Sequence, residues 1–441
     1  MKSIAIVVQD FDTSISPVLF LNGYLNNFGV FIDEIIISEN ASKLQLQKIK
    51  KKLGKYDVIG LSCYDILEKK LFSLFKNSKA ITVIGGPGVT EKVNEFNYTV
   101  IGPGEYFLKQ LLVDNNNDLP SLYIEEDNPQ YQFLIPKASR NKIKKQKEVY
   151  IGIPTYKGCY WSKCCYCNYH KEVTPFSKER ADLVVNSMFN IAKEIKSFAP
   201  NNLKIEFYMT HAAIGKPQLI KILDSFENHV NSGKKINFKW CSFFRSEKWV
   251  LPFIEKISRV NGELDIGFEF LCNEDILNKG YDADTSVKIA LTAYKFNVGV
   301  TGNFMYGIPW ATTQDRIQSL IRIARIRHTL NHGVILQTFT LKNTDLMNYP
   351  EQYGITVKSK VYTGFIKTVG HNKFIKESRQ YVKALCTIFD HKCDEWYCPM
   401  DDELKLNILD KNSTYEIISK FYPKNLDEIK KEIEQVWNVE V

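Results

Sequence analysis

The 441-residue chain lacks several features that would place it in a specialised class of protein. It has no apolar run near the length of a membrane-spanning helix. Its start, MKSIAIVVQDFD, becomes acidic too soon for a signal peptide. No internal repeat or low-complexity segment stands out. We therefore expect a cytoplasmic protein of two or three ordinary domains with no membrane partner.

A strong charge of one sign is also missing, because the net charge is only +8 and 24% of the residues are charged. The one dense basic run, Lys142 to Lys147, favours a solvated linker over a nucleic-acid-binding patch. Ten cysteines, scattered except for one group, do not make a disulfide framework in so long a chain. We expect reduced thiols, a metal site and no nucleic-acid partner.

The one cysteine group lies in KGCYWSKCCYCNYH, residues 157–170, directly after an apolar run. Its spacing is C-x4-C-x2-C, from Cys159, Cys164 and Cys167. Thiolates are the ligands that iron–sulfur clusters and zinc prefer. Three spaced thiolates would leave one iron of a four-iron cluster open for chemistry. Zinc would need a fourth ligand, from Cys165 or His170, and core packing without a metal is the remaining alternative.

This motif resembles the cluster loop of the radical S-adenosylmethionine (SAM) enzymes, in which three cysteines hold a [4Fe-4S] cluster. An aromatic residue precedes the last of those cysteines, as Tyr166 precedes Cys167. The commonest family spacing has three residues between the first two cysteines, whereas this chain has four. The segment GCYWSKCCYCNY looks most like the cluster loops of the subgroup that matures ribosomally made peptides. The resemblance implies Cys159, Cys164 and Cys167 as cluster ligands, with Cys164 favoured over Cys165.

Residues 1–112 alternate short apolar strands with helical stretches, a pattern typical of a doubly wound, Rossmann-like parallel sheet. Ligands of such sheets bind beyond the carboxyl ends of the strands. The turns expected there contain Ser62, Tyr64, Gly85, Gly86, Pro87, Gly102, Gly104 and Glu105.

Because it precedes a radical SAM loop, this segment resembles a cobalamin-binding domain. Three segments resemble strands in the second half of that family's domain: YDVIGLSCY, ITVIGGPGVT and YTVIGPGEYFLKQLL. The resemblance implies that the turns named above bind cobalamin. The loop from Gln9 to Ser16 contains no histidine that could ligate cobalt from below, as in many cobalamin-dependent radical SAM enzymes. A degenerate domain that binds nothing is the alternative.

Residues 113–148 lose the alternation and are expected to be a linker with one short strand near Leu122 to Ile124. From 149 to 340 the alternation returns with longer helices. The expected strands are Val149–Pro154, Leu203–Met209, Ile236–Phe243, Leu264–Leu271, Val298–Tyr306 and Val334–Phe339. The resemblance implies a partial barrel of six β/α units, whose active groups lie at the carboxyl ends of the strands.

Several residues at or near these strand ends match family positions that contact SAM. Glu269 lies in a Gly-Phe-Glu segment followed by Leu277-x-Lys279-Gly280, and Arg245 follows the third strand. The resemblance implies that the SAM-binding residues are Tyr166, Arg245, Glu269, His211 and Gly307. An interior salt bridge for Glu269, a surface role for Arg245 and a structural role for His211 are the alternatives.

The sequence pattern of residues 341–441 predicts structure less clearly. We expect a mostly helical C-terminal domain, with Ser413 as a helix cap. The last helices faintly resemble the winged-helix modules that bind leader peptides, and a solvated cap on the barrel is the alternative. Cys393 and Cys398 suggest packing or loose thiols more than a second metal site.

Taken together, the resemblances imply an enzyme that binds a [4Fe-4S] cluster, SAM and cobalamin. They imply reductive cleavage of SAM to a 5′-deoxyadenosyl radical and C-methylation of an unactivated carbon in a peptide or small-molecule natural-product precursor. A flavodoxin or ferredoxin would be the electron donor. Rearrangement, cyclisation or epimerisation by the same cofactors, methyl transfer without radical cleavage, and a non-catalytic cluster or cobalamin sensor are the alternatives.

Overall fold

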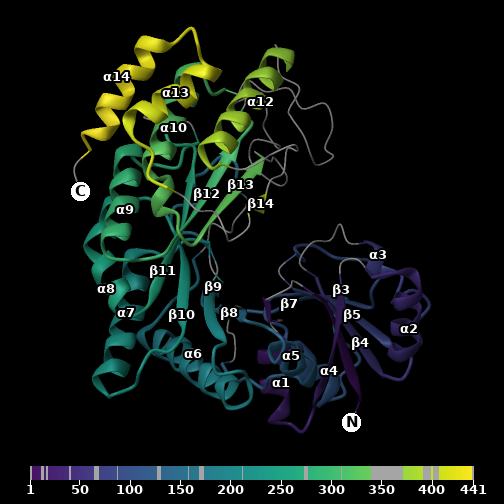
Figure 1. Cartoon of the computed structure of the whole chain (residues 1–441). Helices are drawn as coiled ribbons and strands as arrows, with labels where there is room; N and C mark the ends of the chain where they lie inside the picture. The colour runs from purple at the N-terminus through teal and green to yellow at the C-terminus, as the bar shows by residue number, and fades with distance from the viewer. Residues whose placement is uncertain are drawn as a thin grey trace. The chain divides into compact units, whose positions relative to one another are not determined.

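The computed structural model contains two compact units (Figure 1). The first comprises residues 1–156, 174–210 and 229–239, and the second comprises residues 157–173, 211–228 and 240–441. The structure describes residues 2–10, 14–15, 18–38, 41–63, 69–86, 88–126, 131–156, 158–167, 173–210, 212–272, 277–308, 310–338, 371–390, 399–400 and 407–439.

The N-terminal sheet has six parallel strands in the order β3-β1-β4-β5-β6-β7. They span Ile4–Asp10 (β1), Ile32–Ser38 (β3), Val58–Ser62 (β4), Ile81–Gly85 (β5), Tyr98–Ile101 (β6) and Leu122–Ile124 (β7). Because β1 pairs with β3 on one side and β4 on the other, the strand order reverses at β1. Such a reversal is where ligands of open parallel sheets bind.

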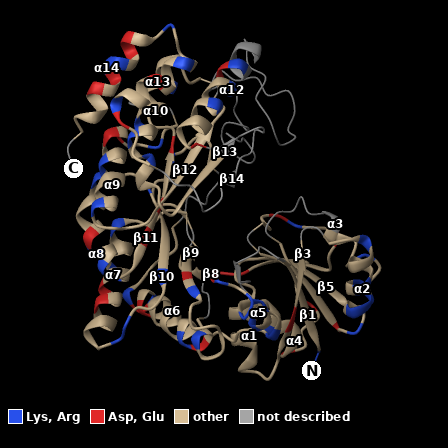
Figure 2. Ribbon diagram, viewed as in Figure 1, with Lys and Arg blue, Asp and Glu red and all other residues tan. Residues whose placement is uncertain are grey.

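Five helices accompany this sheet, at Val18–Asn26 (α1), Lys43–Leu53 (α2), Lys69–Phe72 (α3), Glu105–Leu112 (α4) and Lys137–Ile143 (α5). A capping box between Ser42 and Gln45 starts α2. Its lysines form a basic surface on this unit (Figure 2). Apolar residues of β1, β3, β4 and β5 form a core on each face of the sheet.

The region expected to be a linker contains two elements of this unit. Strand β7 extends the sheet beside β6, and α5 is bonded to β3 because Ser139 Oγ donates to the buried Glu34 carboxylate at 2.6 Å. Residues 113–148 therefore contribute to the sheet and its cover. The composition of the segment conceals this, since only β7 has an apolar pattern.

The second sheet has the strand order β14-β13-β12-β11-β10-β9-β8-β2. Its six parallel strands are Glu148–Pro154 (β8), Lys204–Thr210 (β9), Lys239–Phe244 (β10), Gly262–Glu269 (β11), Val300–Tyr306 (β12) and Gly333–Thr338 (β13). The short strands Ser14–Ile15 (β2) and Pro399–Met400 (β14) pair with β8 and β13. Strands β8 to β13 match the six expected strands and make a half-barrel.

Helices follow these strands at Lys178–Phe198 (α6), Lys216–Asn231 (α7), Ile254–Arg259 (α8), Ala283–Lys295 (α9) and Thr313–Ile326 (α10). Short 3-10 turns span Lys248–Phe253 (η1) and Arg327–Thr329 (η2). Trp240 on β10 stacks on Phe226 of α7, so the apolar side of the strand faces the helices. Within the described residues, we find no helix with the length and apolar character needed to cross a membrane.

Three helices make up the described C-terminal region, at His371–Ile388 (α12), Lys411–Phe421 (α13) and Leu426–Trp437 (α14). The expected cap of α13, Ser413, is wrong. Asp410 caps the helix, because its carboxylate accepts the Ser413 backbone N–H at 2.7 Å. An ionised carboxylate is also the better partner for a helix amino terminus. Cys393 and Cys398 lie outside the described residues.

Candidate active site

The cysteine loop of the second unit, residues 158–167, is fixed to the turn that follows β11. Trp161 Nε1 donates to the Asn278 carbonyl at 2.9 Å, and Asn278 Nδ2 donates to the Lys163 carbonyl at 2.9 Å. The Cys165 N–H donates to the Leu277 carbonyl at 3.4 Å. The cysteine loop thus has a preformed shape, with Gly158 and Ser162 in the left-handed region.

The four cysteines of the loop have different surroundings. Cys165 is 6% exposed, and its sulfur lies 3.5 Å from the Leu277 carbonyl oxygen. Cys159 and Cys164 are partly exposed, and Cys167 is exposed. Burial raises the pKa of the Cys164 thiol to about 11, although the positive charges of Lys279 and Arg245 oppose the shift. A metal would have to displace that proton, since only the thiolate is a strong ligand.

Arg245 lies directly after β10 and is held against the aromatic residues of the cysteine loop. Its guanidinium lies 4.1 Å from the centroid of the Trp161 ring, and its Nε donates to Glu247 at 2.7 Å. Nη2 donates to the Lys279 carbonyl. The residue is 3% exposed, and its Nη1 has no hydrogen-bond partner among the described residues. A buried cation with one open donor is suited to a carboxylate ligand.

Glu269 ends β11 in a strained conformation beside a buried lysine. Its φ is +55°, and the register of β11 against β12 shifts at this point. Lys279 Nζ lies 2.9 Å from the Glu269 carboxylate and also donates to the Gly267 carbonyl. A left-handed conformation is costly for glutamate, and such strain tends to occur where a side chain must be aimed at a ligand. Glu269 therefore has the salt bridge that we weighed as an alternative.

Tyr166 lies between Cys164 and Cys167 in the cysteine loop. Burial raises its pKa well above the ordinary value, and the negative charge of Glu269 raises it further. The phenol therefore stays neutral and can serve as a hydrogen-bond donor. Arg245, Glu269 and Gly307 all lie at the carboxyl ends of barrel strands, which is where barrels of this type place reactive groups. His211 lies outside the described residues.

In the first unit, the turns after β4 and β5 are bonded to each other. The Cys63 N–H donates to the Gly85 carbonyl at 2.7 Å, and the Gly88 N–H donates to the Cys63 carbonyl at 2.9 Å. Gly86 has a φ of +108°, and a Cβ there would lie 2.7 Å from the Cys63 carbonyl oxygen. Only glycine fits such a close approach. Ser62 and Gly85 end their strands beside this turn, whereas Tyr64 and Pro87 lie outside the described residues.

The turn after β6 is occupied by a protein carboxylate. Glu125 is buried and accepts the backbone N–H groups of Tyr106 and Phe107, at 3.0 and 3.1 Å, at the amino terminus of α4. Burial raises the pKa of Glu125, although these N–H groups lower it. Gly104 is the N-cap of α4, and Glu105 is its buried first residue. The predicted residues Gly102, Gly104 and Glu105 thus border a helix terminus that Glu125 already caps.

Sequence reasoning missed the contribution of Lys279 and of Trp161. Lys279 reaches back to Glu269 from the following turn, and Trp161 bridges Arg245 and Asn278. The only signal was Gly280, which has a φ of +64° and ends the Leu277–Gly280 turn. Such contacts depend on the path of a loop that has no periodicity.

We expect Gly280→Ala to loosen the cysteine loop. An alanine Cβ would lie 2.1 Å from the Trp161 ring at a φ of +64°, so it would clash and be strained. The alkylation rate of the buried Cys165 by a thiol reagent, followed by peptide mass spectrometry, should rise on the order of tenfold. Gly233→Ala is the matched control, because it has a φ of +86° and nothing within 4 Å. Equal rates in the two variants would contradict the contact.

No family model matches the sequence, and no curated protein matches it. Solved structures do match. The cobalamin-dependent SAM radical enzyme OxsB with aqua-cobalamin bound has a TM-score of 0.62 and 12% identity, over 98% of this chain and 81% of that chain. The radical SAM methyltransferase TsrM from Kitasatospora setae, with cobalamin and a [4Fe-4S] cluster, has a TM-score of 0.59 and 10% identity, over 99% of both chains.

TsrM with its tryptophan substrate and a SAM analogue also matches, with a TM-score of 0.55 and 13% identity, over 82% of this chain and 79% of that chain. At such low identity the likeness concerns the fold. The two parallel sheets, one of them a half-barrel, are therefore those of the cobalamin-dependent radical SAM enzymes, and the chain has their fold.

Proposed function

We propose that this chain is a cobalamin-dependent radical SAM enzyme and, more specifically, a C-methyltransferase. The observation that carries the proposal is the cysteine loop. Cys159, Cys164 and Cys167 are spaced for a cluster on a loop of fixed shape, while Cys165 is buried against Leu277. Thiolates are the ligands of iron–sulfur clusters, so this donor set fits a [4Fe-4S] cluster with one iron open. The fold shared with OxsB and TsrM supports the same conclusion.

The residues around the cysteine loop fit the charged end of SAM. Nη1 of Arg245 is a buried donor with an open position, which suits the methionyl carboxylate. Glu269 supplies a carboxylate for the methionyl ammonium or the ribose hydroxyls, and its ion pair with Lys279 holds that carboxylate in place. The neutral Tyr166 phenol, which the charge of Glu269 influences, is a further hydrogen-bond donor of the cysteine loop. Packing of Trp161 on Arg245 keeps water from this cation.

The first unit fits cobalamin at the turns after β4 and β5. Ser62 and Gly85 end β4 and β5, the two strands that follow β1 on one side of the reversal, and Gly86 lets the turns after these strands approach closely. We propose that these residues hold the nucleotide tail. Gly102, Gly104 and Glu105 are weaker candidates, since Glu125 already takes the N–H groups there.

Bound at these sites, the cluster supplies the electron that cleaves SAM and cobalamin supplies a carrier for the methyl group. The protein binds SAM, orients it and excludes water. We propose a peptide or small-molecule natural-product precursor as the substrate. TsrM was solved with a tryptophan substrate, and a small-molecule substrate for this chain is consistent with that structure. The C-terminal helices α12 to α14 are candidates for contacting the substrate.

Product analysis tests this function. Anaerobically reconstituted protein, incubated with reductant, deuteriomethyl SAM and candidate substrates, should form both 5′-deoxyadenosine and S-adenosylhomocysteine. Mass spectrometry should find the deuterated methyl group in the product. S-adenosylhomocysteine alone would indicate methyl transfer without radical cleavage. Deoxyadenosine alone would indicate a radical rearrangement, and neither product would indicate a sensor.

A further inference from the structure

A second group of ligand-type side chains lies at the amino-terminal ends of the barrel strands, at the opposite strand ends from Arg245 and Glu269. Cys241 is the third residue of β10, Glu263 is the second residue of β11, and His332 directly precedes β13. Cys241 and Glu263 face each other in register across the β10–β11 pair. They are 2% and 3% exposed, whereas the His332 side chain is 18% exposed and reaches solvent.

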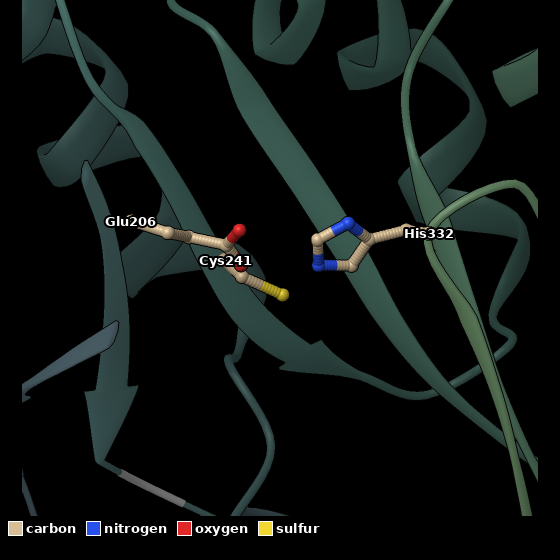
Figure 3. A group of neighbouring side chains, drawn as sticks. All are labelled: Glu206, Cys241 and His332. Carbon is tan, nitrogen blue, oxygen red and sulfur yellow. The ribbon is translucent and has the colours of Figure 1, made fainter. Parts of the chain in front are cut away.

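Cys241 and His332 bring a sulfur and a ring nitrogen close together, and Glu263 lies against the imidazole. Nδ1 of His332 lies 2.9 Å from the Glu263 carboxylate. A neutral imidazole that carries its proton on Nδ1, toward a carboxylate, has its lone pair on Nε2. The Cys241 sulfur and a ring nitrogen of His332 lie within 4.8 Å of each other. Figure 3 shows the thiol and the imidazole pointing toward one another.

The backbone around this group is shaped to hold it. A Cβ at Gly299 would lie 2.7 Å from Glu263 Oε1, so the glycine leaves the space that the carboxylate uses. The His332 N–H donates to the Val300 carbonyl at 3.2 Å, and the Asn331 side chain accepts the Val300 N–H at 3.1 Å. The position of His332 relative to β12 is therefore set by two hydrogen bonds. Metal sites need this kind of support to keep their geometry.

We propose that Cys241 and His332 bind a divalent cation of the zinc type, with Glu263 orienting the imidazole. A thiolate and an imidazole are the pair that zinc prefers among divalent cations, and a carboxylate on the second ring nitrogen is its usual partner. The amino-terminal ends of barrel strands serve stability more than catalysis, so we assign the ion a role in stability. Glu206, also labelled in Figure 3, lies on β9 of the first unit and is not part of the proposed ligand set.

Cobalt titration tests the site in the full-length C159A/C164A/C167A protein, which removes the cluster ligands. After metal removal, Co²⁺ should produce a thiolate-to-cobalt absorption band, and Zn²⁺ should displace it at one ion per chain. Cys241→Ser should abolish the band, and His332→Gln should weaken Co²⁺ binding by at least about 100-fold. Glu263→Gln should weaken it by about 10–100-fold.

Cys386→Ser, a buried cysteine on α12, is the matched control and should keep the band. Zn²⁺ should also raise the melting temperature of the parent by a few degrees (~2–4 °C for each kcal/mol) and should not raise that of Cys241→Ser. If Cys241→Ser fails to fold, His332→Gln gives the same comparison. A thiolate band that persists in Cys241→Ser, or a parent that binds neither ion at micromolar concentration, overturns the proposal and leaves a histidine–glutamate pair beside a neutral thiol.

Discussion

Replacing Cys159, Cys164 and Cys167 together with alanine should reduce the iron content of anaerobically reconstituted protein from about four atoms per chain to nearly none. The broad visible absorbance of the cluster and the formation of 5′-deoxyadenosine should be lost with it. The physical reason is that cluster iron needs thiolate ligands, and the loop offers these three in partly exposed or exposed positions. Iron, sulfide and zinc analysis of the same sample checks the result.

Cys165→Ala is the matched control, because it removes a thiol from the same loop. Its sulfur contacts the Leu277 carbonyl oxygen, so we expect iron to bind with full stoichiometry in this variant. Loss of iron in Cys165→Ala with retention in Cys164→Ala would make Cys165 the middle ligand. Zinc in place of iron and sulfide in the wild-type protein would remove the basis of the proposed function.

Arg322→Ala should lower the free energy of unfolding by about 3–5 kcal/mol, because it leaves a buried carboxylate without its counter-charge. Arg322 lies on α10, and its side chain is 2% exposed. Nη1 lies 2.5 Å from Glu432 on α14, and Nη2 lies 3.0 Å from Asp284 on α9. Denaturant unfolding gives the free energy. Limited proteolysis should release α14 earlier than in the wild-type protein.

Arg259→Ala is the control for this stability prediction. Arg259 and Glu255 form an ion pair within α8, and their side chains are 70% and 50% exposed. Water screens such a pair, so we expect a loss of less than about 1 kcal/mol. Replacing Arg322 and Glu432 together with methionine should recover most of the stability, since no buried charge then remains. If Arg322→Ala and Arg259→Ala lower the free energy of unfolding equally, the buried ion pairs of Arg322 stabilise the protein no more than the exposed pair of Arg259.

The sequence predicted the fold well where periodicity was strong. The six barrel strands lie where short apolar runs indicated them, and long helices such as Lys178–Phe198 alternate with them as expected. The sequence predicted strand β7, but it did not predict that this strand belongs to the N-terminal sheet. A strand of Leu122–Ile124 alone is too short to show which neighbour it pairs with. Polar connections also hide a helix such as α5, which is held to the sheet by side-chain hydrogen bonds.

The candidate site was predictable only as far as its motif. The spacing of the cysteines and the aromatic residue before Cys167 identified the loop. Sequence alone did not show that Cys165 is turned toward Leu277 or that Arg245 packs on Trp161. The salt bridge of Lys279 was not predicted either. These contacts join segments far apart in the chain, and such contacts depend on tertiary packing. The roles of Ser62, Gly85 and Gly86 in cobalamin binding stay predictions.

The distance in sequence between the cysteine loop and its support has a consequence for biosynthesis. Trp161 is bonded to Asn278, which lies 117 residues further along the chain. The N-terminal sheet can form while the ribosome still translates the barrel. The thiols, in contrast, acquire their fixed arrangement only after the turn Leu277–Gly280 has emerged. If the proposed cluster is correct, iron and sulfide are delivered at a late stage of maturation, and the nascent cysteines need a reducing environment until then.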